Sequence, residues 1–425
     1  MNLIEKPGFT LAAALALGLM ACAPEHQDVA EPLVQADLRL TGQGDAGAVD
    51  AGSFAEGAEL VIAPVEVPVD LTPAPKCRLG RTEGCLWAPP LGSQVSEVVF
   101  ADDVSYVDVL GRMRVVPIAV YRAAGAPQPA PLVLMSHGGA DGLSDVTLAL
   151  PEWASIVAAA GYVVISIAHP GYSRDPNAAG SSDYDDLCAA VGVPVAVGAP
   201  CALKTNWARP LDVAAVLTWV TNRVATNPEW AAAIDLGRIG HMGHSAGAGA
   251  AMMVGGVTRN FLCGQPFGKK QGAIVPCSTA DLVSRRAPEV RAIVAFSPQG
   301  PGSDGFMSES FARLAVPTLM ATGLNDGDPG EPASREAVFP LLPEGPRWKV
   351  YLNDPGAKHG LFGGDLGPCL AQATAERCAE LRAALTSAAL AFFDVHLRGG
   401  VDGKVWLGSG DLAAVTAGRC TITRR

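Results

Sequence analysis

The chain has 425 residues, of which 49% are hydrophobic and 17% are charged, and its formal net charge is −11. This composition excludes a largely disordered chain, because it supplies enough apolar surface for a sizeable core. The acidic balance argues against nucleic acid as a partner, since a surface that binds nucleic acid is basic.

The N-terminal segment 1–22 has the pattern of an export signal. Lys6 supplies a short positive region, and a continuous apolar run follows from Phe9 to Met20, too short for a comfortable membrane span. The run ends in LMAC, which resembles a bacterial lipobox. Acylation of Cys22 would anchor a cell-envelope lipoprotein to a membrane face without spanning it. Ordinary signal-peptidase cleavage near Ala23 would instead release a secreted protein.

The next segment, 23–95, is rich in alanine, glycine, proline and acidic residues and shows no sustained period. We therefore expect a low-complexity tether and an irregular lead-in there, followed by one folded domain over 96–425. A small extra domain is the alternative, although the segment lacks helix or strand signals.

Cysteine usage agrees with export. Of the ten cysteines, Cys420 is left over and eight others form close pairs in sequence: Cys77/Cys85, Cys188/Cys201, Cys263/Cys277 and Cys369/Cys378. Local loops closed in this way would each stabilise the fold by about 2.5–3 kcal/mol, and they need an oxidising compartment. No pair has C-x-x-C spacing or a nearby histidine cluster, so we expect no metal site. Cys420 fits a free thiol, an intermolecular bridge or a buried inert residue.

From Glu97 onward the sequence predicts an α/β domain. Short β-prone runs open it as antiparallel strands, and apolar strands then alternate with helices, which predicts a mostly parallel, doubly wound sheet with helices on both faces. The predicted strands are 97–101, 105–110, 113–121, 132–135, 162–168, 238–242, 291–296, 317–322 and 347–352, and the predicted helices are 151–160, 210–224, 246–257 and 381–397, the last closing the chain. Two long insertions, near 171–205 and 259–287, would be lid or rim loops, or inert surface decoration.

The strongest chemical signal is the pentapeptide Gly243-His244-Ser245-Ala246-Gly247. It matches G-x-S-x-G and stands between a predicted strand and a predicted helix, where a nucleophilic serine is expected. Flanking glycines permit close backbone approach at a sharp turn. The helix that begins there offers free N–H groups and a positive dipole end. A glycine-rich packing turn with an incidental serine is the alternative.

Among the seven histidines, His359 is the predicted general base. It follows a late strand, in a loop able to reach Ser245, and it comes after the nucleophile in the chain, as in the order Ser, acid, His. The other histidines have different expected places: His26 in the tether, His137 and His169 after earlier strands, His241 within a strand, His244 within the elbow, and His396 capping the last helix or facing solvent. A solvated loop histidine is the alternative for His359.

The base needs an orienting carboxylate. Asp326 follows the strand 317–322 and lies between Ser245 and His359 in the chain, so it is the favoured acid. Asp328 is the close competitor. A plain turn rich in aspartate, asparagine and glycine is a third interpretation.

An oxyanion hole needs two donors. The N–H of Ala246, directly after the nucleophile, is the first expected donor. The loop Ser136-His137-Gly138-Gly139 follows an earlier strand where the second donor is expected, and the N–H of Gly139 is favoured over that of Gly138. His137 is expected to be structural rather than catalytic.

Several segments, in this order, resemble the bacterial dienelactone-hydrolase-like α/β-hydrolases, a group similar to platelet-activating-factor acetylhydrolase and the polyester-degrading cutinases. They are Ser136-His137-Gly138-Gly139, Ala160-Gly161-Tyr162-Val163-Val164, His169-Pro170-Gly171, Arg209-Pro210-Leu211-Asp212, Arg238-Ile239-Gly240-His241-Met242-Gly243-His244-Ser245, Val316-Pro317-Thr318-Leu319 and Ala357-Lys358-His359.

The resemblance covers roughly the last two-thirds of the chain, and the order of its motifs is more specific than any one of them. It implies the α/β-hydrolase fold, a Ser245/Asp326/His359 triad, and main-chain oxyanion donors at Gly139 and Ala246. Two positions depart from the family. Ala248 stands where a second glycine is usual, and Ser245 replaces the cysteine nucleophile of true dienelactone hydrolases, which argues against that named activity.

Together these patterns predict a serine hydrolase that cleaves carboxylic esters, short-chain or lipid-like, through an acyl-enzyme and without a metal or organic cofactor. Two other functions stay open. One is hydrolysis of amides or peptides by the same triad. The other is a surface lipoprotein that keeps the fold for binding after losing catalysis.

Overall fold

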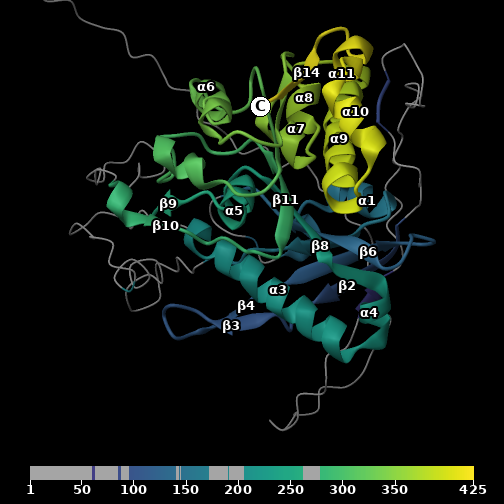
Figure 1. The fold of residues 1–425 in the computed structure, drawn as a ribbon, viewed down its shortest axis with the longest axis vertical. Helices are drawn as coiled ribbons and strands as arrows, with labels where there is room; N and C mark the ends of the chain where they lie inside the picture. Colours follow the sequence, from purple (N-terminus) through teal and green to yellow (C-terminus); the bar gives the residue numbers. More distant parts are fainter. Residues whose placement is uncertain are drawn as a thin grey trace, which may run out of the picture. The chain divides into compact units, whose positions relative to one another are not determined.

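The computed structural model describes residues 60–62, 85–87, 95–139, 143, 145–171, 190, 205–261 and 278–425, all within the compact unit Ala55–Arg425 (Figure 1). The predicted export signal with Cys22, most of the tether and most of both insertions lie outside the described residues. Two of the predicted cysteine pairs, Cys188/Cys201 and Cys263/Cys277, lie outside them as well.

Strands and helices alternate along the described chain, as the sequence predicts. The strands are β1 (Leu60–Ile62), β2 (Val95–Ala101), β3 (Ser105–Val107), β4 (Met113–Val115), β5 (Ile118–Ala123), β6 (Ala130–Ser136), β7 (Val163–Ile167), β8 (Ile234–His244), β9 (Arg259–Asn260), β10 (Leu282–Val283), β11 (Val290–Phe296), β12 (Thr318–Gly323), β13 (Arg347–Leu352) and β14 (Cys420–Arg424). The helices are α1 (Pro151–Ala159), α3 (Arg209–Thr226), α4 (Pro228–Ala233), α5 (Ala246–Val254), α6 (Glu331–Glu336), α7 (His359–Gly363), α8 (Gly367–Leu370), α9 (Ala375–Arg398), α10 (Val401–Gly408) and α11 (Asp411–Val415).

Within the described residues, one mixed sheet has the strand order β1-β2-β5-β7-β6-β8-β11-β12-β13-β14. Every pair from β7 to β13 is parallel, whereas β1, β2 and β5 add antiparallel strands at its start. This is an α/β-hydrolase-like topology, and it confirms the predicted fold class. Parallel strands of one sheet end at the same edge, so the loops after β6, β8, β12 and β13 meet there.

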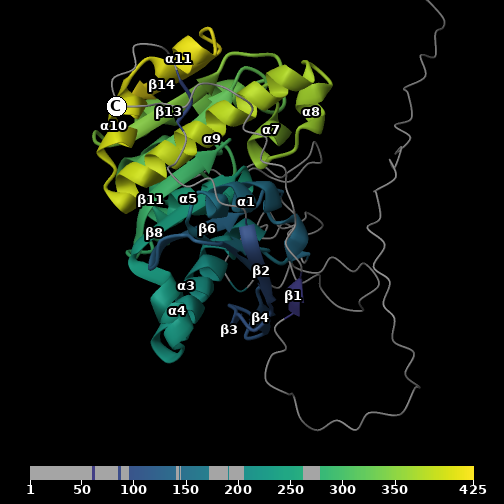
Figure 2. The same cartoon turned by 90° about the vertical axis from the view of Figure 1, so that its right-hand side faces the viewer.

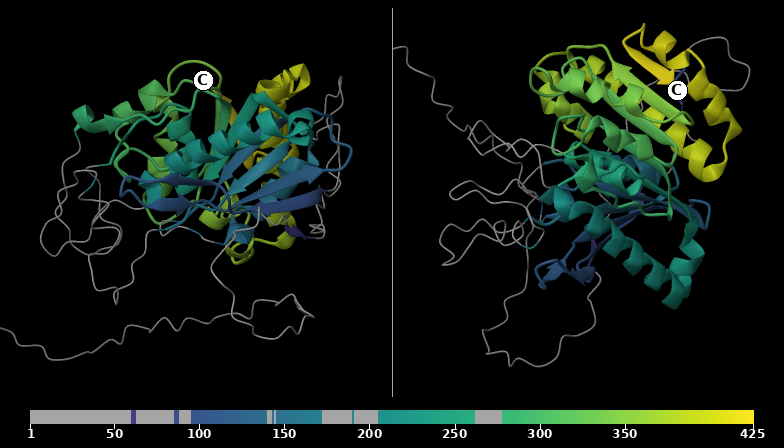
Figure 3. Two further views of the ribbon diagram at one scale, coloured as in Figure 1. Left: turned by 90° about the horizontal axis from the view of Figure 1, so that it is seen from below. Right: turned by 60° about the vertical axis from the view of Figure 1, so that its left-hand side comes forward.

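Helices cover both faces of the sheet. Residues of α3 and α5, such as Val213 and Met253, pack with one face of the central strands, and residues of α1 and α9, such as Trp153 and Phe392, pack with the other. Figure 2 shows α9 on the opposite side of β6 and β8 from α3 and α4, and Figure 3 shows the layers from two further directions. Double coverage explains why β6 is a continuous apolar run that is buried throughout. None of the described helices has the length and apolarity to cross a bilayer.

The structure corrects the sequence prediction at three places. The predicted strand 113–121 is divided by Pro117, which cannot donate to a ladder; β4 pairs with β3 in a separate ribbon, while β5 joins the main sheet. In the expected irregular lead-in, β1 pairs with β2. Finally, α9 does not close the chain, because α10, α11 and β14 follow it. β14, which is rich in β-branched residues, pairs antiparallel with β13 at the edge of the sheet.

Candidate active site

Ser245 stands on a sharp turn between β8 and α5. Its backbone has φ 54° and ψ −118°, a conformation that is strained for a residue with a side chain and that recurs at functional sites. The turn is held by its N–H, which donates to the carbonyl of Phe296 at 2.9 Å. The residue is only partly buried, whereas its neighbours His244 and Ala246 are buried. The turn therefore presents this one side chain at the edge of the sheet.

The two glycines of the pentapeptide are required by close backbone contacts. A Cβ on Gly243 would overlap the carbonyl of Gly247 and lie 2.7 Å from the nitrogen of Ala248. A Cβ on Gly247 would overlap the carbonyl of Ser136 and lie 2.7 Å from that of His137. The first turn of α5 therefore packs directly on the end of β6, which brings Ser245 next to the loop that follows β6.

His359 and Asp326 are joined by a short hydrogen bond. His359 Nδ1 lies 2.7 Å from Asp326 Oδ1. Because a carboxylate only accepts, Nδ1 carries the proton and the lone pair of the neutral ring is on Nε2. Asp326 is fully buried, and Thr322 Oγ1 donates to its other carboxylate oxygen at 2.8 Å. Asp328, its competitor in the sequence, is exposed.

The charge state of Asp326 follows from its partners. Burial raises the pKa of this carboxyl, but the hydrogen bond from His359 and the positive charge of Arg335 outweigh burial and hold the pKa below its usual value. Arg335, from α6, also donates from Nε to the carbonyl of Asp326 at 3.0 Å and from Nη1 to that of Ser297 at 2.6 Å. An ionised carboxylate facing His359 is the arrangement that would stabilise an imidazolium.

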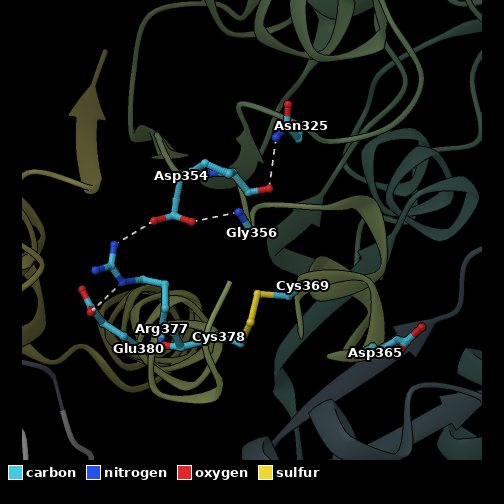
Figure 4. Close-up of a disulfide and its surroundings, with 11 residues drawn as sticks. Asn325, Asp354, Gly356, Asp365, Cys369, Arg377, Cys378 and Glu380 are labelled. Atoms are coloured by element: carbon cyan, nitrogen blue, oxygen red, sulfur yellow. Dashed lines mark hydrogen bonds and ion pairs between the residues drawn. A yellow bond between two sulfur atoms is a disulfide. The ribbon is translucent and has the colours of Figure 1, made fainter. Parts of the chain in front are cut away.

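The loops that carry Asp326 and His359 are fastened to each other. Asn325 Nδ2 donates to the carbonyl of Pro355 at 3.0 Å, and Asn325 forms a parallel bridge with Lys358. Asp354 fixes the β13–α7 loop by accepting from the N–H of Gly356 at 2.8 Å. Figure 4 shows the hydrogen bonds of Asn325 and Asp354 beside the nearby disulfide.

The disulfide Cys369–Cys378 is formed between α8 and α9, as the sequence predicts. It joins the segment that follows His359 to the long helix on that face of the sheet (Figure 4). Cys85 is also disulfide-bonded, to a residue outside the described ones. Cys420 is a buried free thiol, and burial raises its pKa to about 12, so it behaves as an inert core residue.

Ser245 and His359 are linked through His244. Within the described residues, Ser245 Oγ makes no hydrogen bond to His359. Instead, the rings of His244 and His359 lie 4.6 Å apart between centroids, and His244 Nε2 donates to the carbonyl of His359 at 3.0 Å. Burial lowers the pKa of His244 to about 3, so the ring is a neutral spacer between the nucleophile turn and α7. The sequence assigned it no role.

The loop after β6 lies against Ser245. A Cβ on Gly138 would be 3.3 Å from the Cβ of Ser245 and 2.7 Å from His244 Nδ1. Gly139 has φ +87°. Ala246 is the first residue of α5, so its N–H is one of the donors that a helix leaves without an intrahelical acceptor. The structure thus brings the two expected main-chain donors to the same edge as Ser245.

A second serine, Ser136, is part of a buried polar network under the same edge. Its Oγ lies 2.8 Å from His169 Nε2 and 2.8 Å from His241 Nε2. His169 Nδ1 lies 3.0 Å from Asp212 Oδ2, and Arg114 donates to both oxygens of Asp212.

This network has the connectivity of a Ser-His-Asp triad, but its side chains are not accessible to solvent. Ser136, His169, His241 and Asp212 have no exposed surface. Since Asp212 accepts from His169 Nδ1, His169 Nε2 must accept the proton of Ser136, which in turn accepts from His241. Burial lowers the pKa of His169 to about 4 and that of His241 to about 3, so both rings are neutral. The network is not evident from the histidines taken one by one. The motif Arg209-Pro210-Leu211-Asp212, which supplies the buried Asp212, is the signal in the sequence that points to it.

His396 also differs from its expected place. It is partly buried in the last turn of α9, where Gly399 is the C-cap, and its ring packs between aromatic rings, with centroids 5.2 Å from Trp348 and 4.7 Å from Phe392.

No protein-family model matches this chain, and a comparison with curated proteins found no match either. In the described part of the chain, no group of three or more His, Cys, Asp or Glu side chains is arranged to hold a metal ion. The α/β fold class therefore rests on the sheet order and the helices that flank the sheet.

Proposed function

We propose that the protein is a serine hydrolase that cleaves carboxylic esters, with Ser245 as nucleophile, His359 as general base and Asp326 as the orienting acid. The observation that carries this proposal is the buried Asp326 bound at 2.7 Å to His359, at the same sheet edge as a partly exposed serine held at positive φ. The resemblance to dienelactone-hydrolase-like enzymes supports esters as the substrate class.

The reaction is a two-step acyl transfer. His359 Nε2 takes the proton of Ser245 as Oγ attacks the ester carbonyl, and the N–H groups of Ala246 and Gly139 stabilise the oxyanion. Asp326 stabilises the imidazolium that forms. His359 then gives its proton to the leaving alcohol, and a water activated by the same base hydrolyses the acyl-enzyme. In enzymes without bound substrate, the hydrogen bond between nucleophile and base is often long and tightens only in the complex.

Ser245 is preferred over Ser136 on physical grounds. The Ser136 hydroxyl has no exposed surface and already uses its proton and a lone pair on two imidazoles. An ester carbonyl cannot approach it without opening the ends of β6 and β8. Ser245 needs no such opening.

The proposed cellular setting is supported by the sequence alone. An apolar N-terminal run that ends in a lipobox-like LMAC supports export, with a lipid at Cys22 holding the enzyme on the cell envelope. The substrate would then be a small-molecule or lipid ester outside the cytoplasm.

The test compares the wild type with Ser245→Ala and Ser136→Ala. A fluorophosphonate probe is followed by mass spectrometry of the labelled peptide, and hydrolysis is measured with p-nitrophenyl esters of increasing acyl length. We expect label on Ser245 and hydrolysis in the wild type, loss of both in Ser245→Ala, and retention of label at Ser245 in folded Ser136→Ala.

Three other results would each change the assignment. Label on Ser136 would show that the nucleophile is Ser136, in the buried network, and not Ser245. Label on Ser245 with cleavage of anilides but not esters would favour an amide hydrolase. Folded wild-type protein that neither reacts with the probe nor hydrolyses any ester would support a binding lipoprotein and refute the enzyme proposal.

A further inference from the structure

Arg209 lies behind the loop after β6 and has no role in the reaction described above. It is the first residue of α3, and its side chain is fully buried. A buried guanidinium is costly unless its donors are used. Its contacts therefore indicate what it does.

The guanidinium donates to three consecutive main-chain carbonyls of this loop. Nη1 donates to the carbonyl of His137, and Nη2 donates to Gly139 at 2.7 Å and to Gly138 at 3.5 Å. The planar fork of an arginine can hold several acceptors in fixed directions, which a lysine cannot do.

The carbonyl of Gly138 is held a second time, by His137. The main-chain N–H of His169 donates to His137 Nε2 at 3.0 Å, so the proton of the neutral ring is on Nδ1. That Nδ1 donates to the carbonyl of Gly138 at 2.5 Å. The peptide planes at both Gly138 and Gly139 are thus fixed through their oxygens.

In a trans peptide the C=O of one residue and the N–H of the next point in opposite directions. Carbonyls of His137 and Gly138 that converge on Arg209 therefore direct the N–H groups of Gly138 and Gly139 away from it. Two residues of the nucleophile turn lie beside this loop: the place of a Cβ on Gly138 is 2.7 Å from His244 Nδ1 and 3.3 Å from the Cβ of Ser245. A hydrogen bond from a cation also polarises each peptide group and strengthens its N–H as a donor.

We propose that Arg209 is a positioning residue of the oxyanion hole, which fixes the peptide planes of 137–139 so that the loop N–H groups are preset for the developing oxyanion. This inference rests on the function proposed above. Arg209 does not contact the ester; it acts through the loop. Its effect therefore falls on the transition state rather than on substrate binding.

The test measures kcat and KM for p-nitrophenyl esters in Arg209→Ala and Arg209→Lys. We expect kcat to fall about 10²–10³-fold in Arg209→Ala, the loss typical of one oxyanion donor, with KM within about threefold of wild type. Lysine keeps the charge but not the fork, so Arg209→Lys should also lose kcat, by about tenfold or more. Guanidinium ion, at concentrations that leave the melting temperature unchanged, should partly restore kcat to Arg209→Ala but not to Arg209→Lys.

Arg347→Ala is the matched control. Arg347 is a buried arginine that also donates to main-chain carbonyls, those of Val316 at 2.8 Å and Leu314 at 3.1 Å. These two carbonyls precede β12 in the chain, so they lie at the end of that strand opposite to Asp326. Folded Arg347→Ala should keep the wild-type kcat and show no response to guanidinium.

The outcomes separate this proposal from the function on which it rests. An inactive wild type overturns both. An active wild type with unchanged kcat in a folded Arg209 variant overturns the positioning role alone, and so does a loss of kcat that guanidinium restores equally in Arg347→Ala. If Arg209→Ala does not fold, the lysine variant decides, because it fills the same space and keeps the charge.

Discussion

Gly247→Ala tests the contact that sets the nucleophile against the oxyanion loop. The added Cβ would overlap the carbonyl of Ser136 and lie 2.7 Å from that of His137, where real Cβ atoms keep at least 3.0 Å. Both obstacles are backbone atoms, so neither can rotate away. The first turn of α5 must move off β6. Overpacking of this kind costs about 1–3 kcal/mol, and a displacement of about 1 Å at a catalytic group can cost 10²-fold in rate.

Two measurements separate these effects. Thermal unfolding reports the cost in stability, and kcat on a short p-nitrophenyl ester, below the melting transition, reports the displacement of Ser245. The matched control is Gly408→Ala, since a Cβ at Gly408 has no neighbour within 4 Å. Because Gly408 lies in α10, that variant should be as stable as wild type or more stable by up to about 1 kcal/mol, and it should keep its kcat.

A Gly247→Ala protein with wild-type stability and wild-type kcat would refute the reasoning. It would mean that α5 does not approach β6 as closely as the contacts require. The glycine would then be an incidental feature of the pentapeptide.

The other predictions concern the acid, the disulfide and the buried histidines. Asp326→Asn should lower kcat by about 10⁴-fold, as loss of a triad acid does, whereas Asp328→Asn should stay near wild type; equal losses would reject Asp326. Replacing both Cys369 and Cys378 with serine should lower the free energy of unfolding by about 2.5–3 kcal/mol in denaturant titrations, and no change would show that the bridge is dispensable. Burial lowers the pKa of His169 and His396 to about 4 and that of His241 and His244 to about 3. Between those values and about 6.5 the unfolded chain binds more protons, so stability should fall on acidification from about pH 6.5, by at most about 1.4 kcal/mol per pH unit per histidine; a flat profile to pH 4 would contradict their burial.

Much of the fold is predictable because its signals are local. Strands such as β6 are short, mainly apolar runs between turns, and their burial on both faces removes any alternation that could be confused with an edge strand. The prediction erred where tertiary context decides. Pro117 divides a β-prone run between two sheets, and β14 is a polar, β-branched segment that becomes a strand because β13 offers it an open edge.

The residues of the candidate site also differ in how far the sequence predicts them. Ser245 is predictable because close packing on both sides demands glycines at fixed positions, which leaves a pattern in the sequence. Asp326 and Asp328 cannot be distinguished by pattern, since both follow the same strand. Burial of Asp326 against His359 separates them, and that depends on how the β13–α7 loop folds back.

The residues that sequence reasoning missed act through contacts between distant elements. Arg209 and Asp212 come from α3, yet they hold the ends of β6 and β7 through His137 and His169. Arg335 of α6 does the same for the loop that carries Asp326. Each is a buried charge whose cost is offset only when the surrounding carbonyls and carboxylates keep their places. A network of this kind makes displacement of the strand ends costly, so it can preset the geometry that an acyl-transfer reaction needs before an ester arrives. The same reasoning explains why Ser136, which has the better hydrogen bonds, is the worse nucleophile: the contacts that fix it also remove it from the surface.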